Sequence, residues 1–155
     1  MVELLDKLDN AIDCTCTGYY NTYIIDNLVI KEYLYKEEFE DDIFIHQVLD
    51  KHDLMPKMVA NFYHKSYAYL VVEKIYCFDE VVEKTARNLR KSEYFFQCKK
   101  MRDSFNFNWD NKVREYRKEV KKHKINLGED DHIGNFGLTP NGTFVALDEG
   151  LFWCS

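Results

Sequence analysis

The stretch of residues 128–150 reads Gly-Glu-Asp-Asp-His-Ile-Gly-Asn-Phe-Gly-Leu-Thr-Pro-Asn-Gly-Thr-Phe-Val-Ala-Leu-Asp-Glu-Gly. It contains two apolar runs, at residues 136–138 and 144–147, with Pro-Asn-Gly between them. Asn-Gly between two apolar runs is a strong short-range signal for a β-hairpin. A hairpin that begins at Asn135 and ends at Asp148 brings both of its ends to the same edge.

Three oxygen-bearing side chains are expected to converge at this edge. Asp130 lies five residues before Asn135, and Asp148 follows the hairpin. Carboxylate and amide oxygens suit a hard cation such as Mg²⁺, and one carboxylate would then remain as a base. The alternative is an ordinary hairpin with carboxylates on its surface.

The order Asp-x-x-x-x-Asn, a hairpin and Asp-x-Gly resembles the catalytic loop and metal-binding segment of the protein-kinase-like superfamily. The loop Asp-Asp-His-Ile-Gly-Asn is most similar to Asp-Leu-His-Pro-Gly-Asn of the aminoglycoside and small-molecule kinases. The resemblance implies that Asp130 is the catalytic base, that Asn135 and Asp148 bind Mg²⁺, and that ATP is the cofactor. Two positions depart from the family pattern: Gly128 replaces a His, and Glu149 replaces an apolar residue.

The N-terminal part predicts a small antiparallel sheet. Two largely apolar runs, residues 23–25 and 28–33, are separated by the polar pair Asp26-Asn27, which predicts a β-hairpin. Residues 11–20 could supply a third strand. Val29-Ile30-Lys31 is similar to the third-strand lysine motif of kinases, so the resemblance implies that Lys31 pairs with nucleotide phosphates. A lysine on an apolar strand is also commonly a surface residue whose ammonium reaches into water. By the same resemblance, Gly18 would belong to the loop that covers the phosphates.

Residues 36–53 are predicted to form a helix with acidic residues at its N-terminal end. The helix dipole stabilises negative charge at that end. The resemblance implies that this helix provides a carboxylate that pairs with Lys31. Spacing relative to the apolar positions favours Asp41, with Asp42 and Glu40 as close alternatives. Each of these residues is equally consistent with a solvated helix start.

Residues 59–63 and 68–75 predict two more strands, joined by a short polar turn. The second strand resembles the last small-lobe strand of a kinase, which leads into the hinge where main-chain groups hold the adenine edge. The resemblance therefore implies adenine contacts at Glu73 and Ile75. The alternative is a plain buried strand.

Two helices are predicted for residues 79–96 and 109–124, followed by a short strand at 125–127. The basic residues of the second helix indicate a solvated face or an anion-binding surface. The apolar segment 151–153 is expected to be buried, either within the chain or at a homodimer contact. Aromatic packing is expected from Phe95, Phe96, Phe105, Phe107 and Trp109.

The composition limits the classes of partner. The chain has 155 residues, 46% of them apolar, and a net charge of −6, so nucleic acid is not an expected partner. Its apolar runs are too short to span a bilayer, and its N-terminus does not resemble a signal segment. Five scattered cysteines favour a reducing, cytoplasmic location.

The predicted fold is α+β, with residues 1–155 forming a single kinase-like unit. Residues 1–75 would form a small lobe of antiparallel sheet and one helix, and residues 76–155 a reduced helical large lobe that ends in the hairpin. The chain ends five residues after Gly150, so the resemblance is to a minimal, C-terminally truncated kinase.

The predicted function is binding of ATP and Mg²⁺ with transfer of phosphate to a hydroxyl acceptor. The alternative is a catalytically inactive pseudokinase that binds and modulates a host protein. Gly128 and the single-glycine phosphate loop favour this alternative. Short chains rich in Tyr, Asn and Lys are common among phage-encoded proteins that act on a host.

Overall fold

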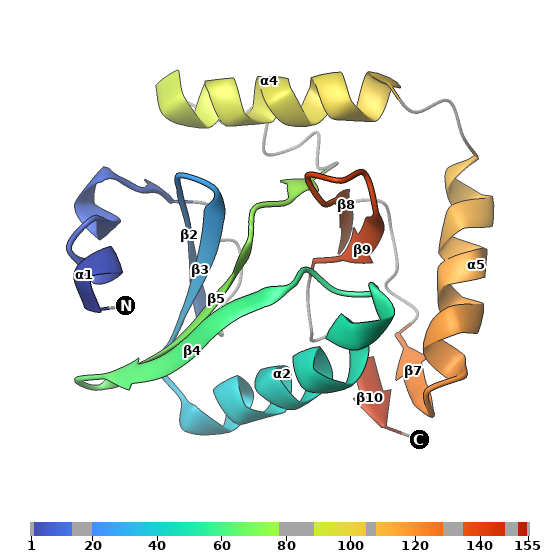
Figure 1. Ribbon diagram of the computed structural model, residues 1–155, viewed down its shortest axis with the longest axis horizontal. Coiled ribbons are helices and arrows are strands. Elements are labelled where there is room, and N and C mark those ends of the chain that lie inside the picture. The colour runs from blue at the N-terminus through green and yellow to red at the C-terminus, as the bar shows by residue number, and fades with distance from the viewer. Residues whose placement is uncertain are drawn as a thin grey trace.

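The computed structural model describes residues 2–13, 20–77, 89–104, 108–128, 135–147 and 152–154. Within them the protein is α+β, and its elements run in the order α1 (Val2–Leu5), η1 (Leu8–Asn10), β1 (Ile12–Asp13), β2 (Tyr20–Ile25), β3 (Leu28–Tyr33), α2 (Lys36–Leu49), η2 (Asp50–His52), β4 (Met58–His64), β5 (Tyr67–Glu73), β6 (Tyr76–Cys77), α4 (Leu89–Ser104), α5 (Trp109–Lys121), β7 (Ile125–Leu127), β8 (Phe136–Leu138), β9 (Phe144–Ala146) and β10 (Phe152–Cys154). The N-terminal elements lie at one end of the molecule, and α5 with β7 and β10 lies at the other (Figure 1). Among the described residues, no helix is both long enough and apolar enough to cross a membrane.

The largest sheet has five antiparallel strands in the order β1-β2-β3-β5-β4. The structure confirms both hairpins predicted for this half of the chain. Asp26-Asn27 joins β2 to β3, and Lys65-Ser66 joins β4 to β5. Asp26 has a φ of 51° and Lys65 a φ of 55°. Two-residue hairpin turns that match the strand twist need such left-handed conformations, and Asp adopts them more readily than most residues.

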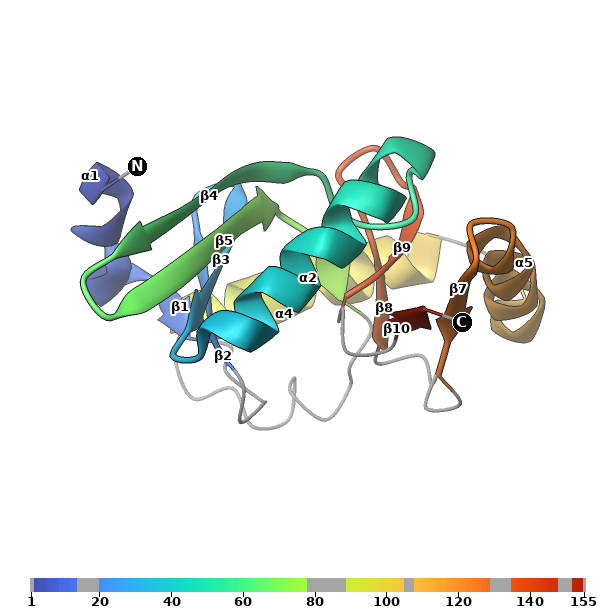
Figure 2. The same ribbon diagram turned by 90° about the horizontal axis from the view of Figure 1, so that it is seen from below.

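The two faces of this sheet are covered by different helices. Side chains alternate along a strand, so Val29, Lys31 and Tyr33 of β3 lie on one face. That face packs against α2 and α4. The opposite face, which includes Ile30 and Val71, packs against α1 and η1. In Figure 2, α2 crosses in front, and α4 passes behind α2. The sheet is therefore a middle layer, and Lys31 points to the side of the larger helices.

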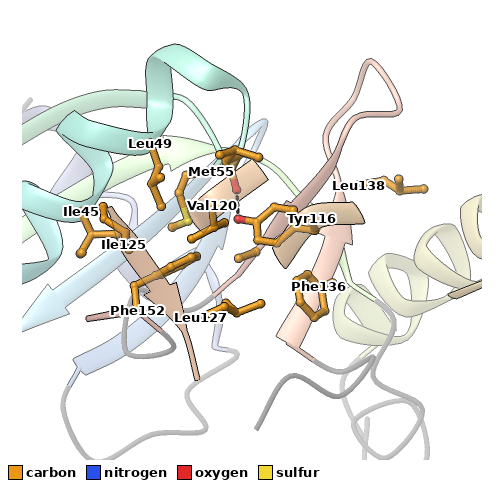
Figure 3. Close-up of a cluster of buried hydrophobic side chains, with 12 residues drawn as sticks. Ile45, Leu49, Met55, Tyr116, Val120, Ile125, Leu127, Phe136, Leu138 and Phe152 are labelled. Atoms are coloured by element: carbon orange, nitrogen blue, oxygen red, sulfur yellow. Dashed lines mark hydrogen bonds between the residues drawn. The ribbon is translucent and has the colours of Figure 1, made fainter. Parts of the chain in front are cut away.

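A second core forms where the end of α2 meets the C-terminal elements (Figure 3). Its strands are the antiparallel pair β7 and β10 and the three-stranded sheet β6-β8-β9. The predicted hairpin is confirmed as β8 and β9, and its predicted last residue, Asp148, lies outside the described residues. Phe152 is 8% exposed within this core, so the apolar C-terminal segment is buried against its own chain at that residue. The buried members are Ile45, Leu49, Leu54, Met55, Tyr116, Val120, Ile125, Leu127, Phe136, Leu138, Ala146 and Phe152.

One buried carbonyl joins three parts of this core. The Tyr116 hydroxyl of α5 donates a hydrogen bond to the carbonyl oxygen of Leu54, in the connection before β4. The backbone N–H of Ala146 in β9 donates to the same oxygen at 3.3 Å. A buried polar group left without partners is costly, so this arrangement fixes α5 and β9 relative to the end of α2.

The C-terminal helices differ from the prediction in extent. The helix predicted to end at residue 96 continues as α4 to Ser104, because residues 97–103 contain no glycine or proline that would stop it. Phe96 is 68% exposed, so it does not take part in the predicted aromatic packing. Phe105 and Phe107 lie outside the described residues.

Replacing Tyr116 by Phe tests the shared carbonyl. Loss of the buried hydroxyl should lower the free energy of unfolding by about 1–2 kcal/mol, since Leu54 keeps one of its two donors. Urea denaturation measures the change, with Tyr63→Phe as the matched control because Tyr63 is 57% exposed. Equal stabilities for the two variants would contradict the assigned role of Tyr116.

Two histidines stack where η2 meets the end of α5. The ring centroids of His52 and His123 are 3.6 Å apart, with 21° between the ring planes. Burial and the neighbouring His52 lower the pKa of His123, with smaller contributions from Lys122 and Lys51, while Glu119 acts in the opposite direction. Protonation of His123 is therefore unfavourable in the folded protein.

This stack predicts a pH dependence of stability. Because the folded protein holds His123 at a lower pKa than the unfolded chain, the unfolded chain takes up the proton first as the pH falls below about 6.5. The contribution of neutral His123 to the free energy of unfolding is therefore complete above that pH. It is lost as the pH falls through the pKa that His123 has in the folded protein. The fall in Tm between neutral and mildly acidic pH should be smaller in His123→Gln than in the wild type. The control variant His64→Gln should retain the wild-type fall.

Candidate functional site

Lys31 is buried in the middle of the sheet. It lies on β3, opposite Thr22 of β2 and Leu70 of β5, and only 5% of its surface is exposed. Its Nζ lies 5.0 Å from the centroid of the Tyr20 ring, a cation–π contact. The alternative of an exposed lysine that reaches into water is therefore excluded.

The Lys31 ammonium reaches the C-terminal hairpin. Its Nζ donates a hydrogen bond to the carbonyl oxygen of Leu147 at 3.1 Å, across 116 residues of sequence. The backbone N–H of Leu147 donates to the carbonyl oxygen of Asn135 at 2.9 Å, which extends the pairing of β8 and β9. Lys31 and the backbone of Asn135 are thus joined through one residue. In the sequence, Leu147 directly precedes Asp148.

Part of the predicted site lies outside the described residues, namely Gly18, Asp130 and Asp148. Asn135 is half-buried, and its amide oxygen is a suitable donor for Mg²⁺. In the part of the chain that is described, no group of three His, Cys, Asp or Glu side chains could hold a metal ion. The convergence of Asp130, Asn135 and Asp148 on one cation therefore remains a prediction.

Of the α2 carboxylates predicted to pair with Lys31, the alternative Asp42 is bonded to the sheet, and the pairing with Lys31 itself stays a prediction. The Tyr33 hydroxyl donates a hydrogen bond to Oδ2 of Asp42 at 2.6 Å, whereas Asp41 is exposed. The buried residues of α2 are Phe39, Ile45, His46 and Leu49. Asp42 lies three residues after Phe39 and three before Ile45, and Asp41 is rotated away from it by about 100°.

Glu38 lies one turn before Asp42 on α2 and is half-buried. Its Oε2 is buried with no hydrogen-bond partner in the described structure. His46, one turn after Asp42, has no exposed surface. Sequence reasoning missed both residues, although the spacing Glu38, Asp42, His46 places polar side chains at successive turns of one side of the helix.

The two residues assigned to the adenine edge already form internal hydrogen bonds. The N–H of Glu73 donates to the carbonyl of Lys57 at 3.0 Å, and Oε1 of Glu73 accepts from the N–H of Lys57 at 3.0 Å. The carbonyl of Ile75 accepts a hydrogen bond of 2.6 Å from the hydroxyl of Tyr94 in α4. Glu73 therefore fastens β5 to the start of β4, and Ile75 fastens the following segment to α4.

A cavity of about 550 Å³ lies beside this segment. Such a volume is typical of small-molecule sites. Its apolar wall includes Ile12 and Ile24 of the sheet. Lys74 and Tyr94 line it as well, and Nζ of Lys74 lies 5.7 Å from the centroid of the Tyr94 ring. The cavity thus lies between the edge of the five-stranded sheet and α4.

Arg117 of the basic helix holds the chain at the point where β7 ends. Its guanidinium donates to the carbonyl of Leu127 at 3.4 Å and to that of Gly128 at 3.0 Å. Gly128 begins the stretch that carries Asp130. The sequence indicated a solvated or anion-binding face for this helix, and it gave no local signal for an arginine bound to main-chain carbonyls.

Comparison with known proteins found no family model that matches the chain and no curated protein that resembles it. The functional interpretation therefore depends on the residues and contacts described above.

The hydrogen bond between Asp42 and Tyr33 can be tested by comparing variants of Asp42 and of its neighbour Asp41. Asp42→Ala removes the acceptor of a hydrogen bond to a charged group and should lower the free energy of unfolding by about 1.5–3 kcal/mol. Asp41→Ala changes an exposed side chain and should stay within about 0.5 kcal/mol of the wild type. Urea denaturation of both variants measures the difference. A larger loss in Asp41→Ala than in Asp42→Ala would contradict the role given to the hydrogen bond between Tyr33 and Asp42.

Proposed function

We propose that the protein is a minimal kinase-like phosphotransferase that binds ATP with Mg²⁺ and transfers phosphate to a hydroxyl acceptor. The observation that carries this proposal is the hydrogen bond between Lys31 and Leu147. It joins a buried lysine of the sheet to the hairpin that bears Asn135 and precedes Asp148. A lysine that neutralises phosphate charge and oxygen-bearing residues that hold a metal ion are two of the recurring parts of phosphoryl-transfer sites.

On this proposal, each residue has a limited role. Lys31 orients the nucleotide phosphates, and Asn135 and Asp148 hold the metal ion. Asp130 accepts the proton of the acceptor hydroxyl. Bound Mg²⁺ would neutralise negative charge that shifts between phosphate oxygens during transfer. Asp42 replaces Asp41 as the α2 carboxylate of the site, because it is the one turned toward β3.

Two further features support the proposal. The five-stranded antiparallel sheet with α2 on one face supports the small-lobe part of the proposal. Burial of Lys31 also strengthens its attraction for phosphate, because water screens the charge less.

A second candidate is a kinase-shaped protein without turnover that binds a host protein. The hydrogen bond from Tyr94 to Ile75 favours it, because that carbonyl is one of the groups assigned to adenine. A pseudokinase needs neither a nucleotide nor a glycine-rich loop. Failure of Mg²⁺ and ATP to change Tm, together with capture of a stoichiometric host protein, would favour this candidate.

The first candidate predicts a Lys31-dependent thermal shift. Saturating ATP with Mg²⁺ should raise the Tm of the wild type by several degrees, since a ligand at about 100 times its Kd stabilises the fold by about 2.7 kcal/mol. Lys31→Met removes the charge while keeping an unbranched side chain, and should abolish the shift. Lys65→Met, at an exposed turn, should keep it. A full shift in Lys31→Met would contradict the proposal.

A further inference from the structure

Strand β4 leaves one edge of the five-stranded sheet open. In the part of the chain that the structure describes, β4 pairs with β5 and with no other strand, and it lies at the outside of the sheet in Figure 2. Pairs that exchange main-chain hydrogen bonds alternate along an antiparallel ladder, and the pair that flanks a two-residue turn is one of them. Counted from His64 and Tyr67, the N–H and C=O groups of Asn61 and Tyr63 point away from β5. These groups are therefore available to a further strand.

This edge carries few of the features that keep free edges apart. Exposed edges are commonly protected by lysine, by proline or by a bulge. Residues 58–64 read Met-Val-Ala-Asn-Phe-Tyr-His and contain no lysine and no proline, in a chain of which 31% is charged. The register of the ladder shifts between Met58 and Ala60, and the rest of the strand is regular. Val59 and Tyr63 are 51% and 57% exposed, so apolar surface accompanies the unpaired main-chain groups.

We propose that β4 pairs with β4 of a second copy of this chain, antiparallel and centred on Phe62, to form a two-fold symmetric dimer. In this register Asn61 lies opposite the partner's Tyr63, so the residues with outward main-chain groups form the hydrogen-bonded pairs. A register centred on Asn61 would instead bring Lys57 toward the partner's Lys65. Like charges directly opposite each other are destabilising, which favours the register centred on Phe62.

A row of aromatic rings leads to the same point of the edge. On the side of the sheet that packs against α1, the ring centroids of Tyr67 and Tyr69 are 6.4 Å apart. The rings of Tyr69 and Phe62 are stacked, with centroids 5.2 Å apart and 18° between their planes. The proposed pairing places two Phe62 side chains directly opposite each other, where aromatic pairs are favourable. The row then continues through both copies, and this favours a second copy over an extended segment of another protein.

The proposed interface closes after two copies. Two-fold pairing uses the free edge of β4 in both chains. The strand at the opposite edge of the sheet, β1, spans only Ile12–Asp13 and includes a carboxylate. Short and charged edges resist further pairing, so a dimer rather than a fibre is expected. The dimer goes beyond the proposed phosphotransferase function and does not depend on nucleotide binding.

Sedimentation velocity of the full chain, at concentrations from about 1 to 500 µM, measures the assembly. The wild type should change from monomer to dimer with a Kd of about 1–100 µM, because one pair of strands makes a small interface. A chain that stays monomeric throughout would overturn the proposal and leave the edge to an extended segment of another protein.

Two variants of one residue isolate the main-chain contribution. Asn61→Pro removes the outward N–H, at an edge position where proline does not interrupt the pairing with β5. It should raise the Kd of the dimer at least about tenfold, since two symmetric hydrogen bonds are lost. Asn61→Thr keeps the N–H and should stay within about threefold of the wild type. A folded Asn61→Pro that dimerises like the wild type would refute pairing through β4.

Amide hydrogen exchange, followed by NMR, tests the same edge in the wild type and decides the question if Asn61→Pro does not fold. The N–H groups of Asn61 and Tyr63 should exchange about three- to tenfold more slowly at the highest concentration than at the lowest. The N–H of Phe62 points toward β5, so its exchange should change far less. A dimer in which Asn61 and Tyr63 exchange as fast as in the monomer would place the interface elsewhere and overturn the proposal.

Discussion

Hydrogen bonds to the carbonyl oxygen of Leu54 fix the C-terminal half of the chain relative to the end of α2. This oxygen accepts hydrogen bonds from the Tyr116 hydroxyl and from the N–H of Ala146, and both donors come from the C-terminal half of the chain. Burial excludes water, so each lost donor would leave the carbonyl less satisfied. With β9 held there, Leu147 follows at a fixed place, and Lys31 can reach it. The candidate site is therefore a consequence of packing around α2.

The short-range features of the fold could be predicted from the sequence. Alternation and turn residues were sufficient for the β2–β3, β4–β5 and β8–β9 hairpins, because those signals act between neighbours in the chain. The orientation of α2 was harder. Phe44 is 50% exposed while His46 has no exposed surface, so the apolar residues of this helix do not mark its buried side. Spacing relative to the apolar positions therefore did not single out Asp42.

The contacts that define the candidate site join residues far apart in the sequence, so local sequence patterns do not predict them. The sequence predicted Tyr94 and Arg117 only as helix residues. Their hydrogen bonds are apparent only in the folded structure, where Tyr94 lies beside Ile75 and Arg117 beside Gly128. Lys31 was identified by a resemblance rather than by its surroundings. Its burial is costly for a charged group, and the contacts with Tyr20 and Leu147 offset part of that cost.

The separation of 116 residues between Lys31 and Leu147 has a consequence during synthesis. At about 5–20 residues per second, a nascent chain would wait on the order of ten seconds between the synthesis of β3 and that of the hairpin that Lys31 contacts. Throughout that interval Ile45 and Leu49 have no C-terminal core to pack against. The second core can therefore fold only after the hairpin has been synthesised, and until then the exposed side of α2 is a surface for chaperones and for aggregation.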